Sequence, residues 1–398
     1  MSDSLRELLR DSGVLTAEWE APLEAAPRRL FLPEMMWPSV EGERIVVSRA
    51  DDPEEWQRWA DTDVPIVTQW DDGHHTGLER GTLATSSSSM PSLVFDMLTE
   101  LSVFDGAKVL EIGTGTGWCA ALLSARLGEE NVVSVEVDAA VAEAARKALA
   151  IAGWHPEVVT GDGLLGQPGR APYDRMLVTA GVREVPRAWI EQTRPGGVIV
   201  LPWGTEYSGQ NAAVRLVVGD DGTASGRFVG ATRFMHIRSQ RGERPDPADY
   251  IPGDTWPDDT RRSGTALTAD VMGGNDLFAP VEFALGLLVP GCVHFSGHDS
   301  RDRSVIWLYG PADRSWAMAF LDDNPARSEV FQGGPRDLWN EIESAYRWWK
   351  AQDSPSHEEF GLTITPTAQT PWLRTPSSPL PQSTDRNGHT AGSTERTW

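Results

Sequence analysis

A glycine-rich loop and two acidic residues stand at the ends of three successive apolar runs in the middle of the chain. The loop reads E-I-G-T-G-T-G from Glu111 to Gly117, Glu136 closes the next apolar run, and Asp162 follows the third. Glycine at every second position allows a tight turn and a close approach of the backbone to a ligand. Because parallel strands end at one edge of a sheet, these residues predict a nucleotide-type site there, whereas the loop alone would fit an ordinary strand-to-helix turn.

The acid inside the loop narrows the choice of ligand. Glu111 disfavours a pyrophosphate and suits a cation, and S-adenosylmethionine carries a sulfonium and an ammonium group but no phosphate. On these residues, the stretch from Val109 to Gly204 resembles the class I methyltransferases. The resemblance implies S-adenosylmethionine as cofactor, with S-adenosylhomocysteine as its product. The implied cofactor-binding residues are Glu111, Gly113, Thr114, Gly115 and Gly117 for the methionine part, Glu136 for the ribose, and Asp162 with Gly163 for the adenine side.

Alternating segments supply the elements that must position this site. From Lys108 to about Val218, short β-branched runs alternate with alanine- and leucine-rich runs, which is the pattern of βαβ units on a parallel sheet. We expect strands at 108–113, 131–138, 156–163, 173–181 and 196–204, helices at 118–128 and 139–153, and two antiparallel edge strands at 212–220 and 226–234. The predicted fold is α/β, with a Rossmann-like doubly wound sheet.

The flanking segments have other compositions. Residues 1–80 are predicted as an N-terminal helical and lid region and residues 81–245 as the Rossmann-like core, with a connection rich in proline and aspartate after it. Residues 255–373 are predicted as an α+β accessory domain. Its VEFAL, VIWLY and WAMAF segments are strand-like, and its PRDLWNEIESAYRWWK segment is helical. Residues 374–398 have too little apolar content to fold and are predicted to be disordered.

Composition restricts the partners of this 398-residue chain. Its 58 acidic against 35 basic side chains give a net charge of −23, which repels nucleic acid and anionic membranes. Only two cysteines occur, Cys119 and Cys292, far apart in the sequence, which argues against a disulfide framework or a zinc site. The N-terminus shows no export signal. We therefore expect a cytoplasmic protein without metal, nucleic-acid or membrane partners.

More specific motifs surround the core, in order along residues 20–240. They are PRRLFLP (27–33), D-x-P at Asp63, S-x-P at Ser89, GDG (161–163), APYDRMLVTAG (171–181) and RPGGVIVLPWG (194–204). Together they resemble the protein-L-isoaspartate O-methyltransferase family. The resemblance implies that Ser89 lies between cofactor and substrate carboxylate, with Ser87 and Ser88 on the cofactor side, and that the preceding segment is a lid over a polypeptide substrate. The candidate substrate-binding residues are Asp63, His74 and His75.

The implied chemistry needs little catalytic machinery. A carboxylate is already ionised at pH 7, so its attack on a sulfonium-bound methyl group needs no general base, metal or covalent intermediate. The site has to align the reactants and exclude water. The Ser89 hydroxyl can donate to one carboxylate oxygen and aim the other oxygen at the methyl group.

Two departures from the family pattern bear on the substrate. TSSSS (85–89) stands where the family usually has T-I-S, and WDDGHHTGLERG (70–81), which we call the lid segment, adds polar residues. With LEIGTGTG and the ending FGLTITPTAQTPWL, these resemble an actinobacterial subgroup associated with ribosomally made peptides (RiPPs), including lanthipeptides and graspetides. The resemblance implies methylation of an aspartate in a macrocyclic precursor peptide, followed by closure to an aspartimide that can hydrolyse to isoaspartate.

From the sequence we favour this tailoring activity. The alternative is repair methylation of isoaspartyl polypeptides, and the alternative of another class is a non-catalytic module that binds S-adenosylmethionine. A serine run is by itself typical of a flexible linker, and loop histidines usually have no function. The flanking D-x-P and S-x-P motifs favour a role for the serines, and His74 and His75 remain candidates for contact with a substrate carboxylate.

Overall fold

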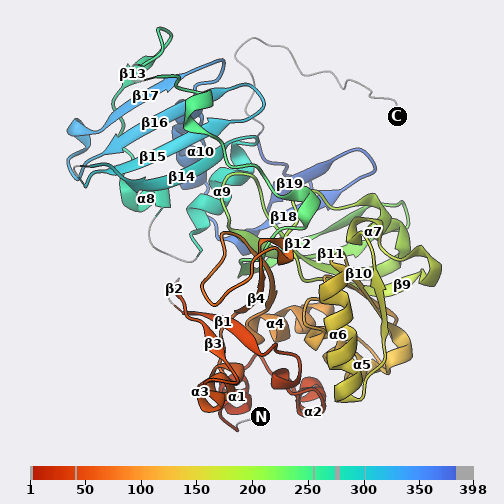
Figure 1. Cartoon of the computed structure of the whole chain (residues 1–398). Coiled ribbons are helices and arrows are strands. Elements are labelled where there is room, and N and C mark those ends of the chain that lie inside the picture. The colour runs from red at the N-terminus through yellow and green to blue at the C-terminus, as the bar shows by residue number, and fades with distance from the viewer. Residues whose placement is uncertain (1–2, 41–42, 254–255, 274–277, 301, 382–398) are drawn as a thin grey trace. The chain divides into compact units, whose positions relative to one another are not determined.

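Two compact units make up the chain (Figure 1). The computed structural model describes residues 3–40, 43–253, 256–273, 278–300 and 302–381. The first unit comprises Met1–Trp203, Ala212–Arg241 and Leu362–Gln369, and the second comprises Gly204–Asn211, Gly242–Gly361 and Thr370–Trp398. Both units are therefore discontinuous in sequence, whereas composition along the chain predicts contiguous domains.

A nine-stranded sheet has most of its strands in the first unit. Its strands are β6 (Val109–Ile112), β7 (Val132–Glu136), β8 (Glu157–Thr160), β9 (Tyr173–Val178), β10 (Thr193–Trp203), β11 (Asn211–Val218), β12 (Ala224–Thr232), β18 (Phe360–Ile364) and β19 (Gln369–Leu373). The order is β19-β18-β12-β11-β10-β9-β6-β7-β8. Strands β10, β9, β6, β7 and β8 are parallel, and β11 is antiparallel to β10. The doubly wound sheet is confirmed, and β18 and β19, from the far end of the sequence, extend the edge expected to end at β12.

The helices that follow the first two parallel strands begin where the sequence predicts. Helix α5 (Trp118–Leu127) starts after Gly117 and is buried on nearly all sides, because alanine and leucine recur all round it. Helix α6 (Ala139–Ala152) is capped by the Asp138 carboxylate, which accepts from two backbone amides, and ends at Gly153 with φ +86°. Both connections place the carboxyl ends of β6 and β7 beside helix N-termini.

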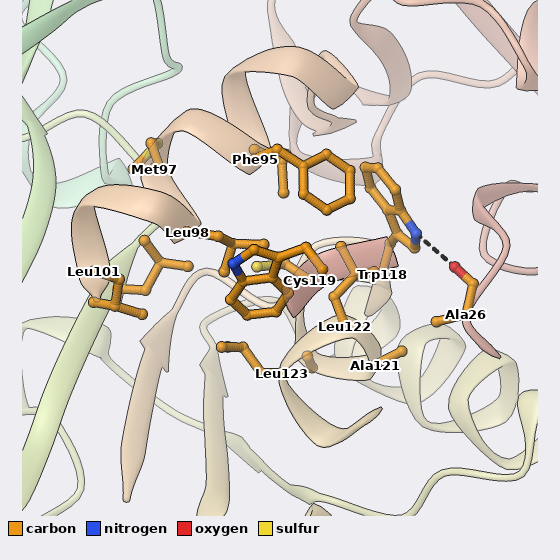
Figure 2. Close-up of a cluster of buried hydrophobic side chains, with 14 of the residues drawn as sticks. Ala26, Phe95, Met97, Leu98, Leu101, Trp118, Cys119, Ala121, Leu122 and Leu123 are labelled. Carbon is orange, nitrogen blue, oxygen red and sulfur yellow. Dashed lines mark hydrogen bonds between the residues drawn. The ribbon is translucent and has the colours of Figure 1, made fainter. Parts of the chain in front are cut away.

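Figure 2 shows the hydrophobic cluster that fixes the start of α5. The Trp118 ring meets Phe95 of α4 (Pro91–Leu101) edge to face, with centroids 6.2 Å apart. Its indole nitrogen donates to the Ala26 carbonyl at 2.9 Å, just beyond the end of α2 (Ala17–Ala25). The residue that follows the glycine loop is therefore locked by packing and by a buried hydrogen bond.

The N-terminal part of the first unit contains more strand than predicted. Its remaining helices are α1 (Asp3–Asp11) and α3 (Pro53–Ala60), and its strands are β1 (Met35–Val40), β2 (Glu43–Arg44), β3 (Val47–Ser48), β4 (Ile66–Trp70) and β5 (Ala84–Ser88). They form a sheet in the order β2-β1-β4-β5, with β3 also paired to β1. Residues 1–80 were expected to mix helix and loop, and these strands escaped prediction because most are short or polar and β1 contains Pro38.

The second unit has a sheet of its own in the order β13-β17-β16-β15-β14. Its elements are β13 (Arg261–Ser263), α8 (Ala269–Gly273), α9 (Pro280–Leu288), β14 (Val293–His298), β15 (Ser304–Gly310), β16 (Ser315–Leu321), β17 (Glu329–Gly333) and α10 (Leu338–Ala351). VIWLY, WAMAF and the α10 helix are confirmed. VEFAL was predicted as a strand, which is wrong: it lies in α9, because Pro280 starts a helix and the apolar run continues through Leu288.

The end of the described chain is packed. Residues 374–381 fall within the predicted disordered tail, yet Leu380 is buried and its amide donates to the Pro371 carbonyl at 3.1 Å. The rest of that predicted tail, 382–398, lies outside the described residues. Among the helices of the described ranges, none combines the length and hydrophobicity that a membrane span requires.

Candidate functional site

The glycine loop lies where β6 ends and α5 begins. Gly113, Gly115 and Gly117 have φ values of +97°, +52° and +88°. A Cβ at Gly113 would lie 2.8 Å from Thr179 Oγ1, so both space and backbone conformation exclude a side chain there. The Gly113 amide donates to the Val135 carbonyl of β7 at 2.8 Å. The positive φ angles, the close approach of Thr179 and the hydrogen bond to β7 together fix the conformation of the loop.

Glu136 joins the loop to the end of β7. Its Oε2 accepts a hydrogen bond from the Gly115 amide at 2.9 Å, and its Oε1 accepts from the Asp138 amide at 3.1 Å. The residue is only 9% exposed. The structure thus brings together the loop and the acid that the strand order predicts at the same edge.

Glu111, at the first position of the loop, is fully buried. Its Oε2 accepts from the Ser134 hydroxyl at 2.5 Å, whereas Oε1 is buried without a hydrogen-bond partner among the described residues. Burial raises the pKa of Glu111 to about 7, against the lowering effects of the Ser134 hydroxyl and of the nearby Cys119 thiol. A buried acceptor without a partner is costly, so the carboxylate suits a ligand that brings a cationic donor.

Three further residues predicted to bind the cofactor make contacts within the protein. The Thr114 side chain is buried and its hydroxyl bonds the Ser134 hydroxyl at 2.6 Å, so the loop can present only the Thr114 backbone. Asp162 is exposed and its carboxylate caps the turn after β8. A Cβ at Gly163 would lie 2.7 Å from the Ile112 side chain. Gly163 therefore allows the turn after β8 to pack against the end of β6.

The serine run forms strand β5 and is not a free linker. Ser87 pairs with Val67 of β4, and Ser88 pairs with Ile66. A Cβ at Gly115 would lie 3.4 Å from the Ser87 carbonyl oxygen, so β5 passes directly beside the glycine loop. The structure therefore brings together two segments that the sequence assigns to one site.

The serines of this run differ in their contacts. Ser86 accepts from the Thr68 hydroxyl at 3.3 Å. Ser88 is 2% exposed, and its hydroxyl accepts from Arg28 Nε at 3.0 Å. The Ser88 hydroxyl, which was expected on the cofactor side, is therefore already bound to Arg28. Ser89 is half-buried, and its hydroxyl makes no hydrogen bond within the described part of the chain. Ser87 is also part-buried, and its hydroxyl likewise makes no hydrogen bond within those residues, so the hydroxyls of Ser87 and Ser89 are both available to a ligand.

Arg28 is the main residue of this region that sequence reasoning missed. It is 1% exposed and donates to the carbonyls of Thr62, Val64, Ser88 and Ser89 at 2.9–3.1 Å, in addition to the Ser88 hydroxyl. Burial lowers its pKa to about 9, so the guanidinium stays charged at pH 7. Arg28 belongs to the PRRLFLP motif, which was the signal available, but nothing in the motif says which backbone it holds.

The three residues expected to contact substrate lie in different settings. Asp63 Oδ1 accepts from the Ser92 amide at 2.8 Å and so caps the start of α4, which occupies this carboxylate. In the lid segment, the His75 ring bonds the Glu79 carbonyl at 2.8 Å, while His74 is exposed. Within the described residues, no group of three or more histidine, cysteine or acidic side chains is arranged to hold a metal ion.

The site fits S-adenosylmethionine on its own geometry. A buried carboxylate with an unpaired oxygen stands in a glycine turn with positive φ angles, and a second acid closes the next strand. Glu111 would hold the ammonium end, the loop glycines would approach the sulfur side, and Glu136 would take the ribose hydroxyls. With the doubly wound sheet, these features define a class I S-adenosylmethionine-dependent methyltransferase.

Comparison with known proteins names the family. Residues 59–242 match the family model described as protein-L-isoaspartate(D-aspartate) O-methyltransferase. The protein-L-isoaspartate O-methyltransferase of Thermococcus onnurineus is 38% identical over 156 residues, which are 39% of this chain and 70% of that protein. Protein-L-isoaspartate O-methyltransferase 1 of Archaeoglobus fulgidus is 31% identical over 243 residues, which are 61% of this chain and 94% of that protein. The chain belongs to the protein-L-isoaspartate O-methyltransferase family.

A solved structure extends the likeness to the second unit. A protein-L-isoaspartate O-methyltransferase with 24% sequence identity and a TM-score of 0.53 covers 94% of this chain and 100% of its own. At that identity the likeness concerns the fold alone. The fold beyond the catalytic core is therefore shared with a protein of this family, and the second unit by itself does not point to peptide tailoring.

Proposed function

We propose that this protein transfers a methyl group to the free carboxylate of an isoaspartyl residue in polypeptides. The observation that carries the proposal is the approach of the serine strand to the glycine loop, where the Ser87 carbonyl faces Gly115 and the Ser89 hydroxyl has no protein partner among the described residues. Family membership supports it, because the relatives reported above carry the name protein-L-isoaspartate O-methyltransferase. The sequence favoured tailoring, and the comparisons favour the alternative.

The proposed mechanism depends on alignment. When bound, S-adenosylmethionine supplies an electrophilic methyl group on a sulfonium sulfur. Ser89 donates a hydrogen bond to one oxygen of the acceptor carboxylate, which leaves the other oxygen free to face the methyl group. Arg28 acts as a positioning residue, because it fixes the carbonyls of Ser88 and Ser89 and so sets the direction of the Ser89 side chain.

No base is needed for this step. The acceptor carboxylate is ionised at neutral pH, and its charge disappears as the ester forms. The proposed role of the protein is therefore to hold a reactive pair in line.

Positive charge on the lid side suits an anionic acceptor. The Arg44 guanidinium lies 5.1 Å from the Trp70 ring centroid, where the lid segment begins. Burial and the charges of Arg80 and Arg233 lower the pKa of Arg44, and none of the three has a carboxylate partner among the described residues. In a chain of net charge −23, such a cluster favours the approach of a carboxylate.

A second candidate is the methylation of an ordinary aspartate in a constrained ribosomal peptide. It rests on the TSSSS run and on the polar lid segment, which depart from the family pattern. The same site would methylate the side-chain carboxylate, and the ring would hold that carboxylate and the next amide in the geometry that closes an aspartimide.

A peptide panel tests the two candidates. The purified protein is incubated with S-adenosylmethionine and, separately, a linear isoaspartyl peptide, its aspartyl isomer, and a macrocyclic peptide that contains the same aspartate. We expect a mass gain of one methylene unit on the linear isoaspartyl peptide alone. A gain, or a loss of one water after ring closure, on the macrocycle alone would support tailoring instead.

Calorimetry with S-adenosylhomocysteine separates enzyme from binding module. Binding without methylation of any peptide in the panel would leave the non-catalytic alternative. The Ser89→Ala variant serves as the matched negative control, because it should bind the same product while it methylates more slowly.

A further inference from the structure

An ion-pair network holds the lid segment to the cofactor-binding edge of the sheet. Asp71 and Asp72, at the start of the lid segment, have φ values of +50° and +53°. This left-handed conformation is uncommon outside glycine, aspartate adopts it more readily than most residues, and surrounding contacts fix it. The partners of the Asp72 carboxylate are therefore the groups that fix this turn.

Two arginines bind the Asp72 carboxylate. Arg241 donates to both of its oxygens, at 3.0 and 2.9 Å, and Arg238 Nε lies 2.9 Å from Oδ1. The partners are separated from Asp72 by more than half of the first unit in sequence, so the contacts close a long loop. All three side chains are one-fifth to one-third exposed, which shields the pairs from solvent more than ordinary surface pairs.

Arg238 also reaches the cofactor edge. Its second terminal nitrogen donates to Asp138 Oδ2 at 2.8 Å, and this carboxylate also accepts from Gln69 at 3.1 Å. Asp138 caps α6 and donates its amide to Glu136, the acid expected to take the ribose. The guanidinium of Arg238 therefore bridges the lid segment and a residue bonded directly to Glu136.

The remaining contacts tie the same turn to β5. Thr85 Oγ1 accepts from the Asp72 amide at 3.1 Å and donates to Gln69 Oε1 at 2.9 Å. Thr85 begins the TSSSS run that ends at Ser89. A shift of Asp72 would therefore disturb Arg238, Asp138 and the strand that carries the serines.

We propose that Arg238 is a positioning residue that couples cofactor occupancy to the placement of the lid segment. A ligand that holds Glu136 also holds Asp138, and Asp138 holds Arg238 against Asp72. The cofactor thus orders the lid segment without touching it. The inference rests on the proposed function only in treating the lid segment as the substrate side.

Hydrogen–deuterium exchange of the full chain tests the coupling without a peptide substrate. In the wild type, S-adenosylhomocysteine should slow exchange in both the glycine loop (111–117) and the lid segment (70–81). In Arg238→Gln, protection of the loop should remain, while protection of the lid segment should fall about fivefold or more, the range of ordinary allosteric coupling. A wild-type lid segment that does not respond to S-adenosylhomocysteine would refute the coupling.

Matched variants separate this role from general stabilisation. Arg187→Gln removes an exposed i,i+4 pair with Glu191 on α7 (Arg187–Gln192) and should leave both responses unchanged. Asp72→Asn should reproduce Arg238→Gln, and Arg238→Lys should restore part of the lid response because it keeps the charge. Equal lid protection in Arg238→Gln, Asp72→Asn and wild type would overturn the proposal.

Methyl transfer to a peptide gives a separate test of the proposal. With an isoaspartyl peptide, Arg238→Gln should raise KM more than it lowers kcat, because the lid segment is misplaced while the reacting groups are intact. Failure of every peptide to be methylated would remove the proposed function and leave the exchange result standing.

Discussion

The cofactor edge and the lid side of the first unit are held together by different kinds of contact. At the cofactor edge, backbone amides of Gly113 and Gly115 bond to groups on the neighbouring strand, and the glycines have no side chains to adjust. On the lid side, arginine side chains reach across 60 to 169 positions of the sequence, from Arg28 to Ser88 and from Arg241 to Asp72. Local backbone hydrogen bonds hold the first region, and side-chain contacts between residues far apart in the sequence hold the second.

This difference matches the different ligands that we assign to the two regions. A backbone cradle tolerates almost no variation, which suits a cofactor that is the same for every class I methyltransferase. Side-chain contacts can be exchanged one at a time, which suits the region where substrates differ. Substitutions in the two regions should therefore change different measured quantities.

The largest effect should come from Arg28 on the lid side. Arg28→Met leaves several buried carbonyls without donors, at about 1–3 kcal/mol each, so we expect a loss of at least about 3 kcal/mol in unfolding free energy. Chemical denaturation measures it. Arg29→Met is the matched control, because Arg29 makes no hydrogen bond with the described residues and its loss should cost far less. Equal losses would mean that Arg28 does not hold the serine strand.

The next effect should come from the loop. Gly113→Val forces a β-branched residue into φ +97° and against Thr179, so the loop must move and affinity for S-adenosylhomocysteine should fall at least about 100-fold by calorimetry. Gly153→Val carries a similar left-handed penalty at φ +86° but meets no atom within 4 Å, and it should bind normally. Loss of binding in both variants would show a general defect of folding rather than a cradle.

The same division explains what could be predicted from the sequence. The strands, α5, α6 and the acids at the strand ends follow from hydrophobic period, glycine spacing and chain order, all of which are local. Arg28 lay inside a quoted motif, but its partners depend on how β4 and β5 pack, and Arg238 and Arg241 had no motif at all. The α9 helix was missed because a short apolar run has no period that separates strand from helix.

A smaller effect should separate the serines of one strand. Ser89→Ala removes one hydrogen bond to a charged acceptor, worth about 1.5–3 kcal/mol, so kcat/KM should fall about 10- to 100-fold while affinity for S-adenosylhomocysteine is unchanged. Ser86→Ala, which loses only the bond with Thr68, should keep its rate. Ser89→Ala with wild-type turnover would remove Ser89 from the mechanism.

The smallest effect concerns pH and the cofactor edge. The pKa of Glu111 is raised to about 7, and the cofactor's ammonium favours the ionised carboxylate. Below pH 7, most Glu111 carboxyl groups are protonated in the free protein and must lose their proton when the ligand binds. Affinity for S-adenosylhomocysteine should therefore increase about tenfold from pH 6 to pH 8, with most of the gain below pH 7.

Two variants check this assignment. Glu111→Gln should bind more weakly and lose the pH dependence between pH 6 and pH 8. Glu143→Gln on the exposed face of α6 should keep it. A pH dependence that survives in Glu111→Gln belongs to another group.

The most direct test of the central claim is the chemical position of the methyl group on an isoaspartyl peptide. Tandem mass spectrometry of the product should place one methyl on the free carboxylate of the isoaspartyl residue, and mild base should convert this ester to a succinimide with release of methanol. A base-stable methyl group, or one on any other residue, would contradict the account.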